Sequence, residues 1–215
     1  MRGAHAARAA LLILSLSFCG LAAADQFVRE PDVDMGEADL AELGEAKMPS
    51  GLANLCAREP AFCEKLEAGS RRLILSSERF RLLSEINSAT NQQISSTTDK
   101  ELYGRVEFWT LPDNAGDCED YVLLKRQRLA AAGIPRSSLL ITVVQDENGE
   151  GHAVLTIPTT SGDLVLDNRR DEILSWQATG YKFVKRQSAA DPNLWVALAH
   201  EKLQATDIAS GPEAP

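Results

Sequence analysis

The sequence predicts an α+β fold, with helices in the N-terminal part and an antiparallel sheet after them. Large apolar residues recur at helical spacing over residues 71–94, which contain neither Pro nor Gly, with an expected break at residues 76–77. Helix-forming residues also dominate residues 118–132. The short apolar segments after residue 138 are separated by turn residues, which is typical of strands in hairpins.

The first 24 residues have the pattern of a secretory signal peptide. Arg2 and Arg8 precede an apolar run over residues 9–21, and the small residues 22–24 supply a cleavage site before Asp25. The run is too short for a membrane span. We therefore expect a periplasmic or secreted protein without a membrane span after cleavage.

A lipoprotein would place Cys19 at its mature N-terminus. Phe18 argues against this alternative, because it is too bulky for the residue before a lipidated cysteine.

The mature chain is expected to consist of a leader, one domain and a tail. Residues 25–50 are acidic and poor in large apolar side chains, which predicts a mobile acidic leader, with packing from about Leu52. Residues 51–200 would form the domain and residues 201–215 a C-terminal tail. Cleavage after residue 24 leaves 20 basic and 31 acidic residues, a net charge of −11. This charge argues against nucleic acid and anionic membrane surfaces as partners.

Export leaves three cysteines in a compartment that favours disulfides, and an odd number leaves one thiol free. Cys56 and Cys63 are close in sequence, and Pro60 breaks any continuous helix between them, so the chain can fold back and bring them within disulfide range. Two buried, reduced cysteines are the alternative. Zinc is disfavoured, because no second Cys or His pair at ligand spacing accompanies them.

Residues 97–117 are expected to form a loop, and Cys118 then opens a helix. Asp117 is a suitable N-cap, and Gly133 and Pro135 mark the helix end. Unpaired N–H groups and the positive end of the helix dipole favour a thiolate in the first turn, and the thiolate is the species that attacks carbonyl groups.

A general base for this thiol has two candidates in the mature chain. His200 follows residues 194–199, which are expected to form a C-terminal helix with His200 on its polar edge. His152 enters a predicted strand beside glycines, a plausible place for a base.

We predict strands over residues 139–144, 152–157, 163–167 and 181–186. The second and third form a hairpin across residues 158–162. If His152 lies directly opposite Asp167, both side chains share one face, whereas a slip of one residue would place them on opposite faces. A catalytic role for this pair therefore predicts the register.

Three motifs in order resemble the bacterial transglutaminase-like cysteine peptidases. They are residues 116–121 (GDCEDY), 151–154 (GHAV) and 166–168 (LDN), and the resemblance covers about residues 52–196. The family includes the periplasmic LapG-type proteases, which cleave large surface adhesins and are controlled by an inner-membrane receptor. It implies a papain/transglutaminase-like fold in which the nucleophile helix packs on an antiparallel sheet.

Carried over to this sequence, the resemblance implies Cys118 as nucleophile, His152 as base and then acid, and Asp167 as the group that orients the imidazole. It implies a protein or peptide substrate, with an adhesin and a regulatory receptor as the partners known from LapG-type members. The backbone N–H of Cys118 would stabilise an oxyanion, and the indole N–H of Trp109 is a second candidate donor, although packing is the more common role of such an aromatic.

Carboxylates surround the predicted nucleophile. Asp117, Glu119 and Asp120 should raise the pKa of the Cys118 thiol and oppose the thiolate. They either suit the helix N-terminus or bind a Ca²⁺ ion that offsets their charge. LapG-type members are calcium-dependent, so the resemblance favours the ion.

Three functions remain open on the sequence alone. An exported endopeptidase is the first, and a transglutaminase- or amidase-type acyl transferase with the same triad is the second, because the acceptor is chosen by the shape of the cleft. A non-catalytic binding module is the third, and the presence of all three triad residues disfavours it.

Overall fold

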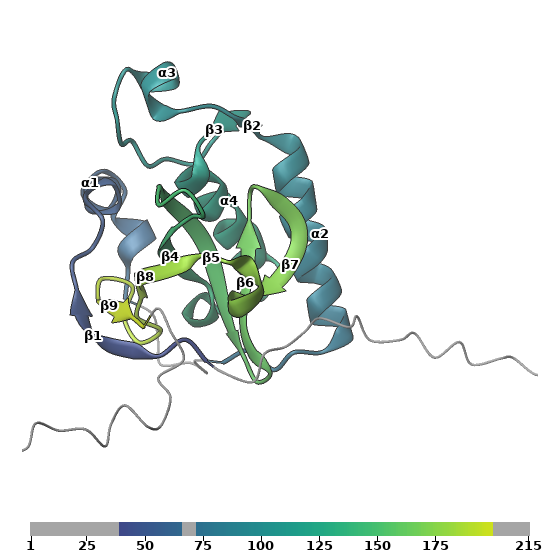
Figure 1. Ribbon diagram of the computed structural model, residues 1–215. Coiled ribbons are helices and arrows are strands. Elements are labelled where there is room, and N and C mark those ends of the chain that lie inside the picture. Colours follow the sequence, from purple (N-terminus) through teal and green to yellow (C-terminus); the bar gives the residue numbers. More distant parts are fainter. Residues whose placement is uncertain (1–38, 66–71, 200–215) are drawn as a thin grey trace, which may run out of the picture. The chain divides into compact units, whose positions relative to one another are not determined.

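The computed structural model describes residues 39–65 and 72–199, which belong to one compact unit (Figure 1). The predicted signal peptide, most of the predicted leader, His200 and the predicted tail lie outside these residues. No helix in the described part of the chain is long and apolar enough to cross a membrane.

The centre of the fold is an antiparallel seven-stranded sheet with the order β1-β9-β8-β4-β5-β6-β7. Its strands are β1 Glu42–Ala46, β4 Leu140–Gln145, β5 Gly151–Thr159, β6 Gly162–Asp167, β7 Arg170–Ser175, β8 Lys182–Gln187 and β9 Trp195–Leu198. Two short strands, β2 Ser95–Ser96 and β3 Ala115–Gly116, form a separate parallel pair.

Helices α2 and α4 pack against this sheet. The helices are α1 Ser50–Arg58, α2 Ser77–Gln93, α3 Asp99–Tyr103 and α4 Cys118–Ala131, with 3-10 turns η1 Pro60–Cys63, η2 Arg136–Ser138 and η3 Trp176–Thr179. α4 packs on β5, and α2 packs on β7 and α4. The main core joins Leu55, Leu83 and Leu129 of these helices to Leu155 and Leu166 of the sheet. Apolar side chains that alternate along β5 and β6 supply the sheet side of this core. The α+β class is therefore confirmed.

The helix prediction holds closely for α4, and for residues 71–94 it holds from Ser77 on, whereas Leu73 forms a β-bridge with Thr159. α2 begins after the expected break, where the Ser76 hydroxyl accepts a hydrogen bond from the N–H of Arg79. α4 begins at Cys118, and Gly133 follows its end with a φ of 89°. The predicted loop over residues 97–117 is only partly correct, because it contains α3, which a capping box at Thr98 begins.

Two predictions at the ends of the domain are wrong. β1 lies inside the predicted mobile leader, and β9 replaces part of the predicted C-terminal helix. β1 and β9 pair with each other, so each supplies the partner that the other needs. Trp195 is buried to 2% exposure, and its packing outweighs the helix propensity of the Ala and Leu residues around it. β7, a charged edge strand, was not predicted.

The hairpin of β5 and β6 differs from the predicted register by two residues. Leu155 lies opposite Leu166 and Thr159 opposite Gly162, so the ladder places Asp167 diagonal to His152 and not directly opposite. Because the shift is even, both side chains stay on the same face of the sheet. The requirement that the side chains of His152 and Asp167 share one face is therefore met.

Cys56 and Cys63 form a disulfide, with their Cα atoms 5.6 Å apart. The bond joins α1 to η1. Cys118 is the free cysteine among the described residues.

Candidate active site

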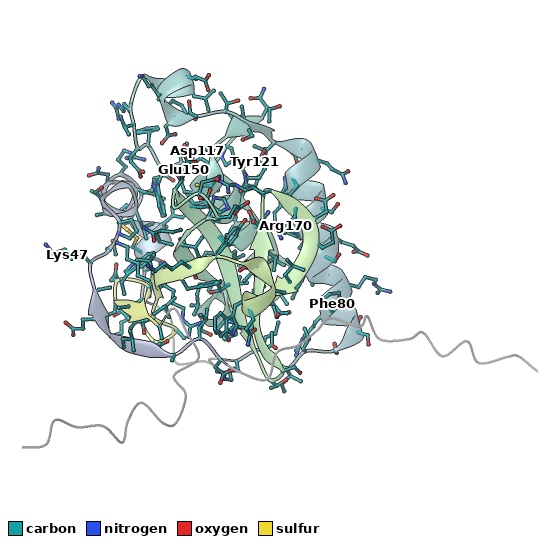
Figure 2. The ribbon with its side chains drawn as sticks, in the orientation of Figure 1. Lys47, Phe80, Asp117, Tyr121, Glu150 and Arg170 are labelled. Carbon is teal, nitrogen blue, oxygen red and sulfur yellow. A yellow bond between two sulfur atoms is a disulfide. The ribbon has the colours of Figure 1, made fainter. Side chains whose placement is uncertain are left out.

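Cys118 is the first residue of α4, and its side chain is partly exposed. Asp117 occupies the N-cap position, but its carboxylate does not cap the helix. It accepts a hydrogen bond from the backbone N–H of Asp99 at 3.2 Å and so ties the start of α3 to the start of α4. Figure 2 labels Asp117 and Tyr121 in this part of the chain.

His152 and Asp167 form a buried pair. Nε2 of His152 lies 2.9 Å from Oδ1 of Asp167, and the two residues are 3% and 2% exposed. The same carboxylate accepts hydrogen bonds from the Tyr181 hydroxyl at 2.6 Å and from the backbone N–H of Arg169 at 3.1 Å. Burial alone would raise the pKa of Asp167, but these bonds and the His152 charge lower it to about 2. Asp167 is therefore ionised at neutral pH.

Side-chain amides from α2 hold the turn that carries Asp167. Nδ2 of Asn91 donates to the carbonyl oxygens of Asp167 and Arg170, each at 3.0 Å, and Nδ2 of Asn87 donates to Arg170 at 3.1 Å. The backbone at Asp167 is thus fixed from a helix that is more than 70 residues away in sequence.

Cys118 and His152 line one pocket of about 190 Å³. Trp109, Glu107 and Ala153 contribute to the same walls. Within the described residues, the thiol makes no hydrogen bond to His152 and instead donates to Oε2 of Glu119 at 3.2 Å. The structure thus places the predicted nucleophile and base at one pocket, with the thiol turned to a carboxylate.

The environment of Cys118 opposes its ionisation, as the sequence predicts. Burial raises the pKa of the thiol well above its usual range, and the Glu119 and Asp117 carboxylates raise it further. The backbone N–H of Ala153 acts in the other direction and lowers this pKa.

A group of three carboxylates lies beside the thiol. Single oxygens of Asp99, Asp117 and Glu119 all lie within 4.8 Å of one another. Two of the predicted metal ligands are therefore together, but their third partner is Asp99 from α3. Asp120, the other predicted ligand, turns toward the preceding loop, where its Oδ1 accepts from the N–H of Thr110 at 3.0 Å.

These carboxylates fit a cation. Oδ1 of Asp99, Oδ1 of Asp117 and Oδ2 of Asp120 are buried and have no hydrogen-bond partner in the described part of the chain. Burial and the neighbouring Asp117 raise the pKa of Glu119 to about 9, and burial with the charges of Asp117 and Asp99 raises that of Asp120 to about 7. Carboxylate oxygens without donors are the ligands that Ca²⁺ prefers.

Trp109 is buried, and its indole N–H donates to Oε2 of Glu107 at 3.0 Å. A methyl group on Gly51 would come within 2.2 Å of its ring, so α1 packs tightly against it. This arrangement favours the packing role over the oxyanion role.

Sequence reasoning missed Asp99, Tyr181 and the two asparagines of α2. Asp99 lies within the capping box of Thr98 and Glu101, in the first turn of α3, which explains an acidic residue there without a metal. Tyr181 had been expected only as the start of a strand. Long-range contacts such as these leave no local signal in the sequence.

Comparison with known proteins gives a family match. The profile of a family described as bacterial transglutaminase-like cysteine proteinase (BTLCP) matches residues 42–203. Among solved structures, calcium-bound LapG from Legionella pneumophila is 31% identical, with a TM-score of 0.47 over 56% of this chain and 70% of that chain. The EGTA-treated LapG of the same organism is 28% identical, with a TM-score of 0.47 over 59% and 72%. A search of curated proteins gave no match.

Proposed function

Because the chain belongs to the bacterial transglutaminase-like cysteine proteinases, we propose that it is an exported endopeptidase that uses Cys118, His152 and Asp167 as its catalytic triad. Membership of this family makes the chain a transglutaminase-like cysteine peptidase. The buried His152–Asp167 pair at the pocket that holds the Cys118 thiol is the observation that carries the assignment of the residues.

The bond to Asp167 determines the role of the two imidazole nitrogens. Nε2 of His152 faces the carboxylate, which leaves Nδ1 to take the thiol proton. The thiolate then attacks the carbonyl carbon of the scissile amide, and the backbone N–H of Cys118 donates to the developing oxyanion. His152 returns the proton to the leaving amine, and a thioester forms on Cys118. Water attacks this thioester while His152 takes its proton, which then returns to the thiolate as the carboxylic acid leaves.

For this chemistry the thiol must leave its hydrogen bond to Glu119. We propose that Asp99, Asp117 and Glu119 hold a Ca²⁺ ion, with Asp120 as the further candidate from the sequence. When bound, the ion would offset the negative charge beside the thiol and fix the start of α4.

The proposed site of action is outside the cytoplasm, because residues 1–24 have the pattern of a signal peptide. The substrate would be a protein, and the sequence resemblance to LapG-type proteases points to a surface adhesin, and hence to biofilm formation, with an inner-membrane receptor as regulator. A net negative charge favours neither nucleic acid nor anionic lipid as partner.

Iodoacetamide labelling of the protein over residues 25–215 tests the triad. We expect selective modification of Cys118, with a rate that falls at least about tenfold in His152→Ala, since the base is lost. Lys182→Ala on an exposed part of β8 is the control and should match the wild type. Equal labelling rates in wild type and His152→Ala would overturn the assignment.

A second experiment tests hydrolysis. Incubation with an extract of bacterial surface proteins should produce new N-termini that are absent with Cys118→Ala. Incorporation of a labelled amine into glutamine-containing peptides, without new N-termini, would instead establish an acyl transferase.

A further inference from the structure

A second pocket lies away from the candidate active site. It has a volume of about 250 Å³ and shares no lining residue with the first. η1 contributes Ala61 and Phe62, α4 contributes Leu123, Arg126 and Gln127, and η2 contributes Arg136. We call it the arginine pocket, because two guanidinium groups line it beside apolar walls.

Arg126 is buried and makes no ion pair with a carboxylate of the described residues. The residue is 5% exposed, and its Nε donates to the carbonyl oxygen of Leu139 at 3.1 Å. No acceptor among the described residues bonds its two terminal nitrogens. Arginine is seldom buried so deeply unless it is paired, since desolvation of the charge is costly.

Arg136 adds a second positive charge to the same pocket. Its Nη2 donates to the carbonyl oxygens of Ala61 at 3.4 Å and Phe62 at 3.2 Å, which holds the side chain beside η1. No ion pair of Arg136 occurs within the described residues. Burial together with this neighbouring charge lowers the pKa of Arg126 to about 10.

Among the described residues the other buried arginine, Arg186, does have carboxylate partners. Arg186 is also 5% exposed, but its guanidinium contacts Asp163 at 2.8 Å and Glu42 at 2.9 Å. The exposed Arg169 pairs with Asp146 at 2.8 Å. The sequence holds 31 acidic and 22 basic residues, yet no carboxylate is among the described residues that line this pocket with Arg126 and Arg136. An external anion could therefore take the place of a carboxylate there.

We propose that the arginine pocket binds the carboxylate of an acidic side chain in a partner peptide. A guanidinium group presents paired N–H donors that match the two oxygens of a carboxylate. Phe62 and Leu123 provide an apolar wall for the methylene groups of a Glu or Asp side chain. The pocket volume suits one side chain, not a larger folded element.

The position of the pocket connects it with the catalytic elements. Arg126 lies on α4, which begins at Cys118, and η1 is joined by the disulfide to α1, which packs on Trp109 through Gly51. An acidic segment bound there would be an exosite contact of the protein that the enzyme engages. Binding itself does not rest on the proposed peptidase triad.

Nuclear magnetic resonance titration of the ¹⁵N-labelled protein over residues 25–215 tests the proposal. The probe is an acetylated, amidated peptide with one Glu between alanines, and its control has Gln in place of Glu, both at constant ionic strength. We expect saturable shifts at Phe62, Leu123 and the Arg126 Nε–H, with at least about tenfold weaker binding of the Gln peptide.

Arg136→Gln should weaken the Glu peptide by at least about fivefold, and this half-buried position avoids the risk of unfolding that a change at Arg126 carries. Arg81→Gln, on the exposed side of α2, is the matched control and should bind normally. Equal affinity for the Glu and Gln peptides, or unchanged binding by Arg136→Gln, would overturn the proposal. Failure of the triad experiments leaves this binding result unaffected, so the two proposals are tested separately.

Discussion

Nε2 of His152 lies 2.9 Å from Oδ1 of Asp167, although the two residues occupy diagonal positions on β5 and β6. Diagonal neighbours on one face of a sheet are farther apart than directly opposed residues, so long side chains are needed to span them. The imidazole reaches across, and Tyr181 and Arg169 fix the carboxylate that it meets. The pair is therefore held from three sides.

Substitution of Asp167 should lower the labelling rate of Cys118, by more for Ala than for Asn. Asp167→Ala removes the acceptor that orients His152, and we expect a loss of about 10²–10⁴-fold. Asp167→Asn keeps Oδ1 as an acceptor, and the Tyr181 hydroxyl can turn to accept from the amide, so a loss of only about tenfold is expected. Rates of iodoacetamide modification, followed by mass spectrometry, rank the wild type and the two variants. An alanine variant as fast as the wild type would show that Asp167 does not orient the base.

Tyr181→Phe should lower the free energy of unfolding by about 1–3 kcal/mol at neutral pH, because it removes a buried hydrogen bond to a charged group. The pKa of Asp167 is depressed to about 2, so the stability that its partners provide is present above pH 3.8 and is lost as the pH falls toward 2. The difference between the variant and the wild type should shrink over that range. Urea unfolding at several pH values measures it, and a difference independent of pH would exclude the Asp167 contact as its source.

Calcium affinity separates the ligand set seen in the structure from the one predicted by the sequence. Asp99→Asn should weaken Ca²⁺ binding by at least about tenfold, since Asp99 lies with Asp117 and Glu119. Asp120→Asn is the matched comparison and should have a smaller effect, because Oδ1 of Asp120 accepts from Thr110. Isothermal titration calorimetry gives both affinities. A larger loss of Ca²⁺ affinity in Asp120→Asn than in Asp99→Asn would favour the set predicted from the sequence, Asp117, Glu119 and Asp120.

Lys125→Met should stabilise the protein at low pH. Lys125 is 1% exposed, its Nζ has no hydrogen-bond partner among the described residues, and burial lowers its pKa to about 7. Below pH 7 the buried charge imposes its full cost, and this cost disappears as the pH rises toward 10.5, where the unfolded chain also loses its proton. The gain of Lys125→Met should therefore be largest near pH 6, at about 1–4 kcal/mol, and small near pH 10.

Urea unfolding at pH 6 and pH 10 checks this trend. Lys182→Met, at an exposed position of β8, is the control and should show no such dependence on pH. A gain of equal size at both pH values would show that the charge is not the cause.

Local patterns predicted the parts of the fold that local interactions determine. The start of α4 at Cys118 was predicted from Asp117, and its end from Gly133. The strand that begins near His152 was predicted from its apolar run. β1 and β9 could not be predicted in this way, because each is a strand only through pairing with the other. The exact register of β5 and β6 was not predicted either. The observed turn between Thr159 and Gly162 and the longer loop expected over residues 158–162 both leave His152 and Asp167 on the same face of the sheet.

The candidate site shows the same division. The proposed nucleophile, base and carboxylate lie in sequence motifs, and the structure places Cys118 and His152 at one pocket. Asp99 is 18 residues from Asp117, and its proximity depends on how the loop around α3 folds back. Tyr181 reaches Asp167 from the segment after η3, a contact that no spacing in the sequence indicates.

The pairing of β1 with β9 brings the two ends of the domain together, with Glu42 opposite Leu198 and the N–H of Ala199 bonded to the carbonyl oxygen of Ala41. The first and last described strands of the domain are therefore hydrogen-bonded neighbours. A short linker between these ends would permit circular permutation, with new termini opened at the exposed turn around Gly149. The order in which the elements are synthesised could thus be changed while α4, β5 and β6 keep their neighbours.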